Sequence, residues 1–256
     1  MRDGIFSLQG RTALVSGASS GIGLHVARTF AAAGAAVALA ARRTERTGSS
    51  VSELVAAGHR AASVYMDVTD AGTIGPAFDE AERLLGAPID VLINNAGVMH
   101  AETFVAHADA DLDRVIDTNL KGCFRVAQEA ARRMLPLRRG AIVNVSSTAG
   151  LRPGAFMASY AASKAGLIHL SRVMALELAG KGIRVNVLCP GNIDTDMQAV
   201  LGEKGFHETM LKRTPMRRFG RLEDLDGAFL LLASDAGRYM TGAVITVDGG
   251  QTLSWM

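Results

Sequence analysis

The sequence has few of the residues that build disulfide frameworks or metal sites. It has two cysteines and six histidines in 256 residues, and the histidines never fall into a zinc-binding spacing such as HExxH. Cys123 and Cys189 lie far apart in apolar surroundings, which favours free core thiols in a reducing compartment. These scarcities exclude a disulfide-stapled secreted domain, and we expect no metal site.

Neither the net charge nor the length of the apolar runs points to a nucleic acid or a membrane. The 27 basic and 25 acidic residues leave a formal charge of +2, too small for a polyanion-binding surface. The apolar stretch 31–41 is too short to span a bilayer, and the first residues lack the apolar core of a signal peptide. We therefore expect a cytoplasmic globular protein that binds neither nucleic acid nor membrane.

Short β-branched runs alternate with longer segments of helical periodicity. The candidate strands are residues 12–16, 36–40, 62–66, 90–94, 141–146, 183–188 and 243–247. Because these runs are apolar throughout and separated by helices, they predict parallel strands in a sheet covered on both faces. No linker or short repeat interrupts the pattern, so we expect one α/β domain over 1–256, with a Rossmann-type doubly wound sheet. Ligands of such sheets bind beyond the carboxyl ends of the strands.

A glycine-rich turn, SGASSGIG at 16–23, follows the first candidate strand and precedes an apolar helix. Gly17 suits a tight turn, while Gly21 and Gly23 allow close approach of a pyrophosphate and of the helix to the sheet. The helix N-terminus would add free N–H groups and a positive dipole. The residues predicted to bind the cofactor here are Gly17, Ser19, Ser20, Gly21, Ile22 and Gly23. The spacing differs from GxGxxG, and a plain strand–helix connection is the alternative.

The residues after the second and third candidate strands indicate which dinucleotide is preferred. An acidic residue after the second strand would bind the adenosine ribose and repel a 2′-phosphate. Ala41 stands there instead, followed by Arg42 and Arg43, whose guanidinium groups suit phosphate. We expect NADP(H) to be preferred, with NAD(H) possible; solvated cap charges are the alternative. Asp67 and Val68 stand where a carboxylate meets the adenine amino group, and helix capping by Asp67 is equally compatible with the spacing.

Eight motifs occur together and in one order. They are SGASSGIG (16–23), DV (67–68), NNAG (94–97), Asn119 in a long helix, SS (146–147), YAASK (160–164), PGNIDT (190–195) and VDGG (247–250). With this set, the chain resembles the short-chain dehydrogenase/reductase family over essentially its whole length. YxxxK alone is a weak signal, whereas eight ordered matches on the expected strands and helices are a strong one. The resemblance implies a seven-stranded parallel sheet, a nicotinamide cofactor and hydride exchange between a carbonyl and an alcohol.

The resemblance assigns catalytic roles to four polar residues. It selects Ser147 over Ser146, because the family's serine stands thirteen residues before the tyrosine. Tyr160 would give its proton to the substrate oxygen, and Lys164, one helical turn further on, would favour the phenolate and hold the ribose hydroxyls. Ser147 would donate a hydrogen bond to the same oxygen, and Asn119 would hold a water linking Lys164 to solvent. The alternatives are an ordinary surface helix for the Tyr–Lys pair and a helix-bend hydrogen bond for Asn119.

The same resemblance implies further cofactor contacts after the fourth and sixth strands. They are Asn94, Ala96, Gly97, Pro190, Gly191, Ile193 and Thr195. Asn95 is expected to brace the central strands instead. One departure concerns Ser20, because many NADP-preferring members of the family carry a basic residue at that position, just before the second glycine of the turn.

The substrate is the part that the sequence leaves open. It is expected between residues 149–158, residues 100–104 and a lid at about 196–216, for which a surface helix pair is the alternative. Arg152, Lys212 and Arg213 are candidates for an anion contact. A 3-oxoacyl thioester, a sugar acid or a small ketone would fit the pattern.

The resemblance also implies an assembly, and one different function is weighed against catalysis. A homotetramer is expected through helices 111–135 and 158–179, with a homodimer possible. The alternative function is a non-catalytic dinucleotide sensor or scaffold of the same fold, which would lack the catalytic Tyr or Lys; both are present here.

Overall fold

The computed structural model describes residues 4–195 and 207–253, which contain a seven-stranded, entirely parallel sheet in the order β3-β2-β1-β4-β5-β6-β7. The strands are β1 (Thr12–Ser16), β2 (Ala36–Ala41), β3 (Ala61–Tyr65), β4 (Val91–Asn94), β5 (Gly140–Val145), β6 (Ile183–Pro190) and β7 (Val244–Val247). Each lies within two residues of its predicted range. The predicted Rossmann-type doubly wound sheet is confirmed.

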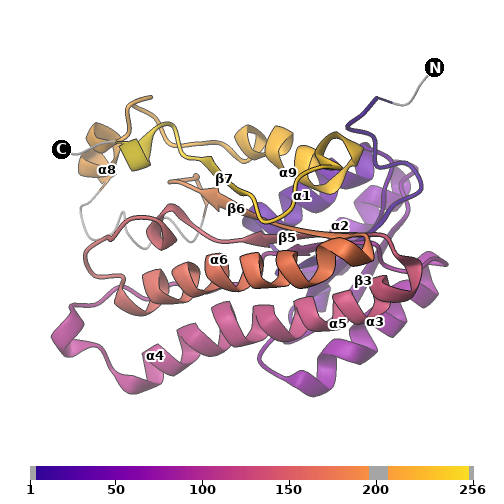
Figure 1. Cartoon of the computed structure of the whole chain (residues 1–256), viewed down its shortest axis with the longest axis horizontal. Coiled ribbons are helices and arrows are strands. Elements are labelled where there is room, and N and C mark those ends of the chain that lie inside the picture. Colours follow the sequence, from indigo (N-terminus) through magenta and orange to yellow (C-terminus); the bar gives the residue numbers. More distant parts are fainter. Residues whose placement is uncertain (1–3, 196–206, 254–256) are drawn as a thin grey trace.

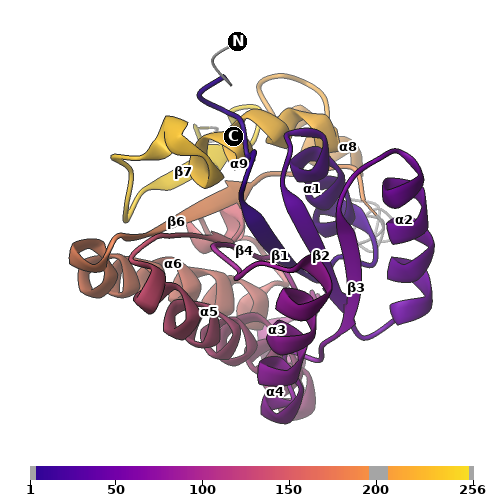
Figure 2. The ribbon, with the colours of Figure 1, turned by 90° about the vertical axis from the view of Figure 1, so that its right-hand side faces the viewer.

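Helices cover both faces of this sheet (Figures 1 and 2). They are α1 (Gly21–Ala32), α2 (Thr44–Ala56), α3 (Ala71–Leu85), α4 (Asp109–Ile116), α5 (Cys123–Leu137), α6 (Ala158–Leu178), α8 (His207–Arg213) and α9 (Asp226–Ala233). Helices α1, α2 and α9 lie on one face, and α3, α5 and α6 lie on the other. No helix in the described ranges is long and apolar enough to cross a membrane.

The side chains of strand β2 contribute alternately to two hydrophobic cores, one on each face of the sheet. All six of its residues are buried, with Ala36, Ala38 and Ala40 in the core under α3 and α5, and Val37 and Leu39 in the core under α1 and α9. This division follows from the alternation of side chains along a strand. Small alanines on one side leave room for larger helix residues, such as Phe78 of α3 in the same core.

Bulky aromatic side chains complete each core. Phe30 of α1 and Phe229 of α9 are fully buried on one face, as is Phe78 of α3 on the other. Full burial of one such ring stabilises the fold by roughly 1.5–3 kcal/mol. Cys123 and Cys189 are buried and unpaired, as predicted, and burial raises the pKa of each thiol to about 11. Both therefore stay protonated and act as small apolar groups.

The long helix predicted at 111–135 is interrupted by a different helical geometry. Between α4 and α5 the chain forms a π-helical segment, η2 (Asp117–Gly122), which contains Asn119. A Cβ at Gly122 would lie 2.9 Å from the carbonyl oxygen of Val68, so this segment packs tightly against the turn after β3. Such π-helical segments are rare and often lie at functional sites.

The strand order places the ligand-binding edge of the sheet. The connections from β1 to β2 and from β3 to β4 take the chain to opposite sides of β1, so the strand order reverses there. A crevice forms outside the carboxyl ends of the strands at such a point. The loops that follow these strands gather at the left-hand end of Figure 1, together with α8.

Candidate active site

Two adjoining cavities lie at the carboxyl edge of the sheet. The turn cavity, of about 250 Å³, lies between the glycine-rich turn and the residues that follow β2, β3 and β4. The α6 cavity, of about 570 Å³, lies between the start of α6, the residues that follow β5 and β6, and α8. Ile22, Asn95, Gly97 and Thr195 line both cavities, so together they form one elongated site.

Most of the predicted site residues line one of these cavities. Those of the turn cavity are Gly17, Ser19, Ser20, Gly21, Ile22, Arg42, Arg43, Asp67, Val68, Ala96, Gly97 and Thr195. Those of the α6 cavity are Ser147, Tyr160, Lys164, Pro190, Gly191 and Ile193, with Ile22, Gly97 and Thr195 shared. Gly23, Asn94 and Asn119 line neither cavity.

The turn cavity has a wall of backbone because its glycines leave no room for side chains. Gly17 has φ +67°, and a Cβ there would lie 2.8 Å from the Cα of Ala96. A Cβ at Gly23 would overlap the carbonyl oxygen of Gly17, so Gly23 lets α1 pack onto the turn. Ser20, the N-cap of α1, makes no side-chain capping hydrogen bond. The first N–H groups of α1 thus have no side-chain cap at the cavity that Ser20, Gly21 and Ile22 line.

Two guanidinium groups stand at the other side of the turn cavity. Arg42 Nη1 lies 3.9 Å from Asp67 Oδ2, and Arg43 Nη2 donates a hydrogen bond to Ser19 Oγ at 3.2 Å. Ala41, at the end of β2, is buried and lines the cavity without offering a carboxylate. The end of β2 thus supplies two cations and no carboxylate of its own at the place where the sequence predicts a phosphate, and the nearest acid is Asp67 from the turn after β3.

Asp67 closes a turn and does not cap a helix. Its Oδ1 accepts hydrogen bonds from Thr69 N at 2.9 Å and Thr69 Oγ1 at 2.7 Å. The N-cap of α3 is Asp70, which accepts from Gly72 N at 2.8 Å, so the helix-capping alternative for Asp67 is wrong. Burial acts to raise the pKa of Asp67, but the hydrogen bonds from Thr69 and the charge of Arg42 hold it below its usual value. The carboxylate therefore stays ionised beside the cavity.

Of the two adjacent asparagines of NNAG, Asn95 braces the end of β1 as expected, whereas the side chain of Asn94 lies in the core. Asn94 is fully buried, and its Nδ2 donates to the carbonyl of Cys123 at 2.8 Å and to Asn144 Oδ1 at 3.1 Å. Its side chain braces β4 against β5 and α5, so a cofactor contact of Asn94 stays a prediction that only its backbone can meet. Asn95 braces the turn through Ser16 O at 3.1 Å and also lines both cavities.

Tyr160 and Lys164 lie on the first turns of α6 with both side chains enclosed. Tyr160 is 9% exposed and Lys164 is 4% exposed, so the surface-helix alternative is wrong. Lys164 Nζ lies 5.7 Å from the centre of the Tyr160 ring and donates to the carbonyl of Val145 at 2.9 Å. A buried ammonium needs such a partner, and burial keeps its charge close to the phenol with little screening by water.

The two serines after β5 have different partners. Ser146 Oγ donates to the carbonyl of Lys164 at 2.8 Å, which ties the strand end to α6. Ser147 Oγ accepts from Ala149 N at 3.1 Å, which leaves its own hydrogen free to be donated into the cavity that it lines. The geometry therefore agrees with the selection of Ser147 over Ser146.

Asn119 joins the π-helical segment to the loop after β4. Its Oδ1 accepts from Val98 N at 2.8 Å, and its Nδ2 donates to Val98 O at 2.8 Å and to Ser163 Oγ at 3.1 Å. These partners lie outside its own helix, so the helix-bend alternative is wrong. A Cβ at Gly97 would lie 3.3 Å from Asn119 Oδ1 and 3.5 Å from Lys164 Nζ, so both side chains converge on Gly97. The water link to Lys164 stays a prediction.

The segments predicted to hold the substrate line much of the α6 cavity. The loop between β5 and α6 contributes Ala149 and residues 152–157, and the loop after β4 contributes Met99 and Ala101. Of the predicted lid, residues 196–206 lie outside the described residues, whereas three residues of α8 line the cavity. Phe156 has φ +65°, a strained value for a bulky residue, and its carbonyl accepts from Glu102 N at 2.9 Å. This contact links the two loops.

The C-terminal segment is a part of the site that the sequence did not predict. Gln251 and Thr252 line the α6 cavity. Asp248 of the VDGG motif holds them in place, because its carboxylate accepts from Gly250 N at 2.8 Å and Thr252 N at 2.7 Å. Arg152 donates in turn to the carbonyl of Thr252. In the sequence, the VDGG motif was the available signal for this segment, although nothing in VDGG indicates that the residues after it line the substrate side of the site.

Comparisons with known proteins agree with this fold. The chain matches the family described as enoyl-(acyl carrier protein) reductase over residues 17–252. It is 41% identical over 243 residues to the 3-oxoacyl-(acyl-carrier-protein) reductase of Thermotoga maritima, covering 95% of this chain and 98% of that protein.

Solved structures give the same result. A short-chain type dehydrogenase/reductase from Mycobacterium marinum is 37% identical with a TM-score of 0.92, covering 97% of this chain and 98% of that one. A gluconate 5-dehydrogenase from Burkholderia cenocepacia J2315, in complex with NADP and tartrate, is 34% identical with a TM-score of 0.94, covering 99% and 100%. The chain belongs to the short-chain dehydrogenase/reductase family and is an oxidoreductase of CH–OH and C=O groups.

Proposed function

We propose that this protein reduces a carbonyl group to a secondary alcohol, or catalyses the reverse reaction, with NADP(H) preferred over NAD(H). The supporting observation is the single elongated site, which has Arg42 and Arg43 at one end and Ser147, Tyr160 and Lys164 at the other. A 3-oxoacyl thioester, a sugar acid and a small ketone are the candidate substrates. The Thermotoga relative is named for the first, and the Burkholderia relative is named for a sugar acid and holds NADP.

The residues along the two cavities match the successive parts of a dinucleotide, from its phosphates to its nicotinamide. The uncapped N-terminus of α1 would hold the pyrophosphate, because its N–H groups and dipole favour anions. Arg42 and Arg43 would bind the 2′-phosphate, and Lys164 would hold ribose hydroxyls. Pro190, Gly191, Ile193 and Thr195 would place the nicotinamide, which when bound supplies hydride to a carbonyl or takes it from an alcohol.

The polar residues of the α6 cavity would manage the proton and the charge on the substrate oxygen. The Tyr160 hydroxyl would donate its proton to that oxygen in reduction and accept it in oxidation. The ammonium of Lys164, whose Nζ lies 5.7 Å from the centre of the Tyr160 ring, would place positive charge near the tyrosine as its proton leaves. Ser147 would stabilise the developing negative charge through its free O–H, as an oxyanion donor does. Asn119, fixed by Val98, would hold the water that relays protons from Lys164.

The proposal extends to the whole chain and its assembly. We place one catalytic domain over 1–256, with α8 as the described part of a lid over the α6 cavity. A homotetramer, or a homodimer, would cover the exposed apolar residues Leu112 and Phe124 along α4 and α5, and Leu176, 84% exposed on α6. Light scattering of the wild type and of Leu176→Asp tests this, because the charged variant should dissociate. A cytoplasmic location suits the two unpaired cysteines.

The decisive experiment is a panel of acetoacetyl thioesters, gluconate and aryl ketones, assayed with NADPH or NADP⁺ and with NADH or NAD⁺. Turnover of at least one compound, faster with the phosphorylated cofactor, is expected. Binding of NADPH without turnover of any compound would favour the non-catalytic sensor instead.

A further inference from the structure

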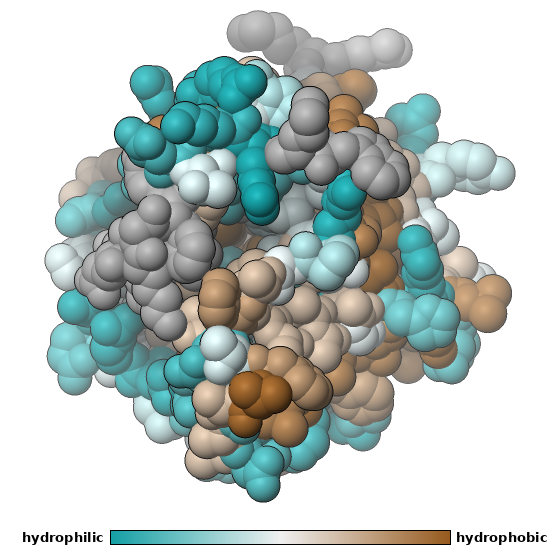
Figure 3. Space-filling model, turned by 90° about the vertical axis from the view of Figure 1, so that its left-hand side faces the viewer, coloured by the Kyte–Doolittle hydropathy of each residue, from teal (hydrophilic) through white to brown (hydrophobic). Residues whose placement is uncertain are grey.

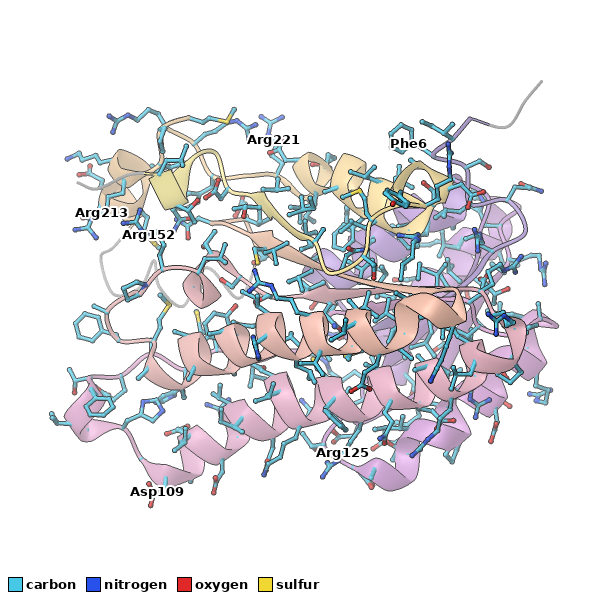
Figure 4. The ribbon with its side chains drawn as sticks, viewed as in Figure 1. Phe6, Asp109, Arg125, Arg152, Arg213 and Arg221 are labelled. Atoms are coloured by element: carbon cyan, nitrogen blue, oxygen red, sulfur yellow. The ribbon has the colours of Figure 1, made fainter. Side chains whose placement is uncertain are left out.

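The α6 cavity contains cationic side chains but no anionic one. Its charged lining residues are Arg152, Lys164 and Arg213, and no Asp or Glu is among the described residues that line it. Lys164 is buried at the base of the cavity and bonded to the Val145 carbonyl. The two arginines come from the loop after β5 and from the end of α8, and Figure 4 shows them at the same end of the molecule. The cavity is thus electropositive at its base and at its rim.

Arg213 differs from the cations near it in sequence. Lys212 Nζ lies 3.5 Å from Glu208 Oε2, and Arg218 Nη1 lies 2.6 Å from Asp224 Oδ2. Arg213 forms no ion pair or hydrogen bond with any residue of the described ranges, yet it lines the cavity. Lys212 and Arg218 do not line it. A charge left without a counterion at a cavity mouth attracts an anion from solution.

Part of the α6 cavity is apolar, because Phe156 and Met157 line it. The hydrogen bond from Glu102 N to the carbonyl of Phe156 joins their loop to the loop that carries Phe104 and Val105, which are 81% and 94% exposed and lie outside the cavity lining. Figure 3 views this end of the molecule and shows apolar surface in its lower half, with hydrophilic surface above, toward α8. A ligand that is complementary to both the cationic and the apolar parts of the α6 cavity has a negative group and an apolar portion.

We propose that the substrate carries a carboxylate or phosphate away from the reacting carbonyl, and that Arg213 and Arg152 bind this group. This inference rests on the proposed function and narrows its substrate class. Two guanidinium groups match the oxygens of a carboxylate or phosphate through paired N–H donors. Phe156 and Met157 hold the intervening carbon chain. Among the candidate substrates, a sugar acid or the phosphate-bearing arm of a carrier thioester has such a group, and a neutral aryl ketone does not.

Matched pairs of charged and neutral ketones test this proposal. Reduction of 4-oxopentanoate is compared with that of its methyl ester, and hydroxyacetone phosphate with hydroxyacetone, at saturating NADPH. The wild type should favour the charged member of at least one pair by about tenfold in kcat/KM, because a rim arginine is partly screened by solvent. The favoured pair distinguishes a carboxylate site from a phosphate site.

The variant Arg213→Gln separates charge recognition from structure. It should lower kcat/KM for the charged member about tenfold more than for the neutral member, so that the preference for the charged member disappears. The matched control is Lys212→Gln, which removes the same charge from the same helix and should keep the wild-type preference. Arg152→Gln should also weaken the preference, and its melting temperature must be measured because Arg152 holds the Thr252 carbonyl.

Two results overturn the inference. One is a wild type that treats both members of both pairs alike, and the other is an Arg213→Gln variant that loses charged and neutral turnover equally. If no ketone is turned over, the proposed function fails, and the anion site is tested by calorimetric titration of the NADPH-loaded protein with unreactive glutarate and with inorganic phosphate. Binding of either that is lost in Arg213→Gln supports the site, and equal or absent binding in both proteins overturns it.

Discussion

The turn cavity and the α6 cavity adjoin but are built from different materials. On one side, the turn cavity is walled by backbone and short side chains from one run of eight residues, 16–23, and Arg42 and Arg43 stand on the other side. The α6 cavity is walled by longer side chains from separate loops, from α8 and from the C-terminal segment. A backbone wall requires glycine at fixed positions, whereas a side-chain wall accepts any residues of suitable shape. The first therefore leaves one continuous motif in the sequence. In the second, motifs such as SS, YAASK and PGNIDT supply part of the lining, whereas the loops on the substrate side leave almost no signal.

The largest effect is expected from the loss of a single oxygen atom, the hydroxyl of Tyr160, from the α6 cavity. Tyr160→Phe should lower kcat by about 10³-fold, because general acid–base catalysis typically contributes 10²–10⁴-fold, while NADPH affinity stays near that of the wild type. Turnover is followed by NADPH consumption and binding by fluorescence titration. Tyr239→Phe is the matched control, since Tyr239 is fully exposed and lines neither cavity. Retained turnover in Tyr160→Phe would contradict the assigned role.

The next effect tests whether side chains at the edge of the turn cavity choose the cofactor. Ala41→Asp combined with Arg42→Ala should shift the ratio of kcat/KM for NADPH over NADH toward NADH by about 100-fold. The change removes charge-assisted hydrogen bonds worth about 1.5–3 kcal/mol each and adds a repelling carboxylate. Steady-state kinetics with both cofactors measure the ratio. An unchanged ratio would show that Arg42 is only a solvated charge.

A pair of glycine variants tests the backbone wall itself. Gly17→Ala should weaken NADPH binding by at least about tenfold and destabilise the fold by about 1–2 kcal/mol, because alanine is strained at φ +67°. Gly48→Ala is the control: Gly48 lies within α2 with open space around it, and alanine should stabilise the helix by up to about 1 kcal/mol. Urea unfolding and NADPH titration distinguish the two. If the two variants behave alike, the wall of the turn cavity does not require glycine at position 17.

The smallest effect concerns a carboxylate that lines neither cavity, Asp224. A hydrogen bond from Arg218, then one from Arg221 N, lowers the pKa of Asp224 from 3.8 to about 2. A depressed pKa contributes stability above the unfolded value, and this contribution is lost as the pH falls through the folded value. Asp224→Asn should therefore melt below the wild type from pH 7 to about pH 4, with the gap closing toward pH 2. A gap that widens at low pH would contradict this sign.

The fold and the cofactor side could be predicted because their determinants are local. The apolar runs gave all seven strands, and SGASSGIG located the turn that Gly17 makes possible. YAASK placed Tyr160 and Lys164 on one helix face, and the fold brings both residues to the α6 cavity. In each case a short stretch contains the spacing that the geometry requires.

The remaining features could not be predicted because they depend on contacts between distant segments. The roles of Asn94 and Asn95 are set by which one meets Asn144 on the neighbouring strand. The π-helical segment around Asn119 reflects the close packing of Gly122 on Val68, and no periodicity in the sequence reports it. Likewise, the i,i+4 spacing in the sequence is enough to pair Lys212 with Glu208, but only the fold shows that the neighbouring Arg213 lines the cavity.

The hydrogen bonds of Asp248 have a practical consequence for work with this enzyme. Through Gly250 and Thr252, this carboxylate fixes the segment that carries Gln251 into the cavity wall. Directed-evolution libraries aimed at new substrates should therefore include positions 251 and 252 and leave Asp248 unchanged. A purification tag is better fused to the N-terminus, so that it does not disturb the C-terminal segment that lines the α6 cavity.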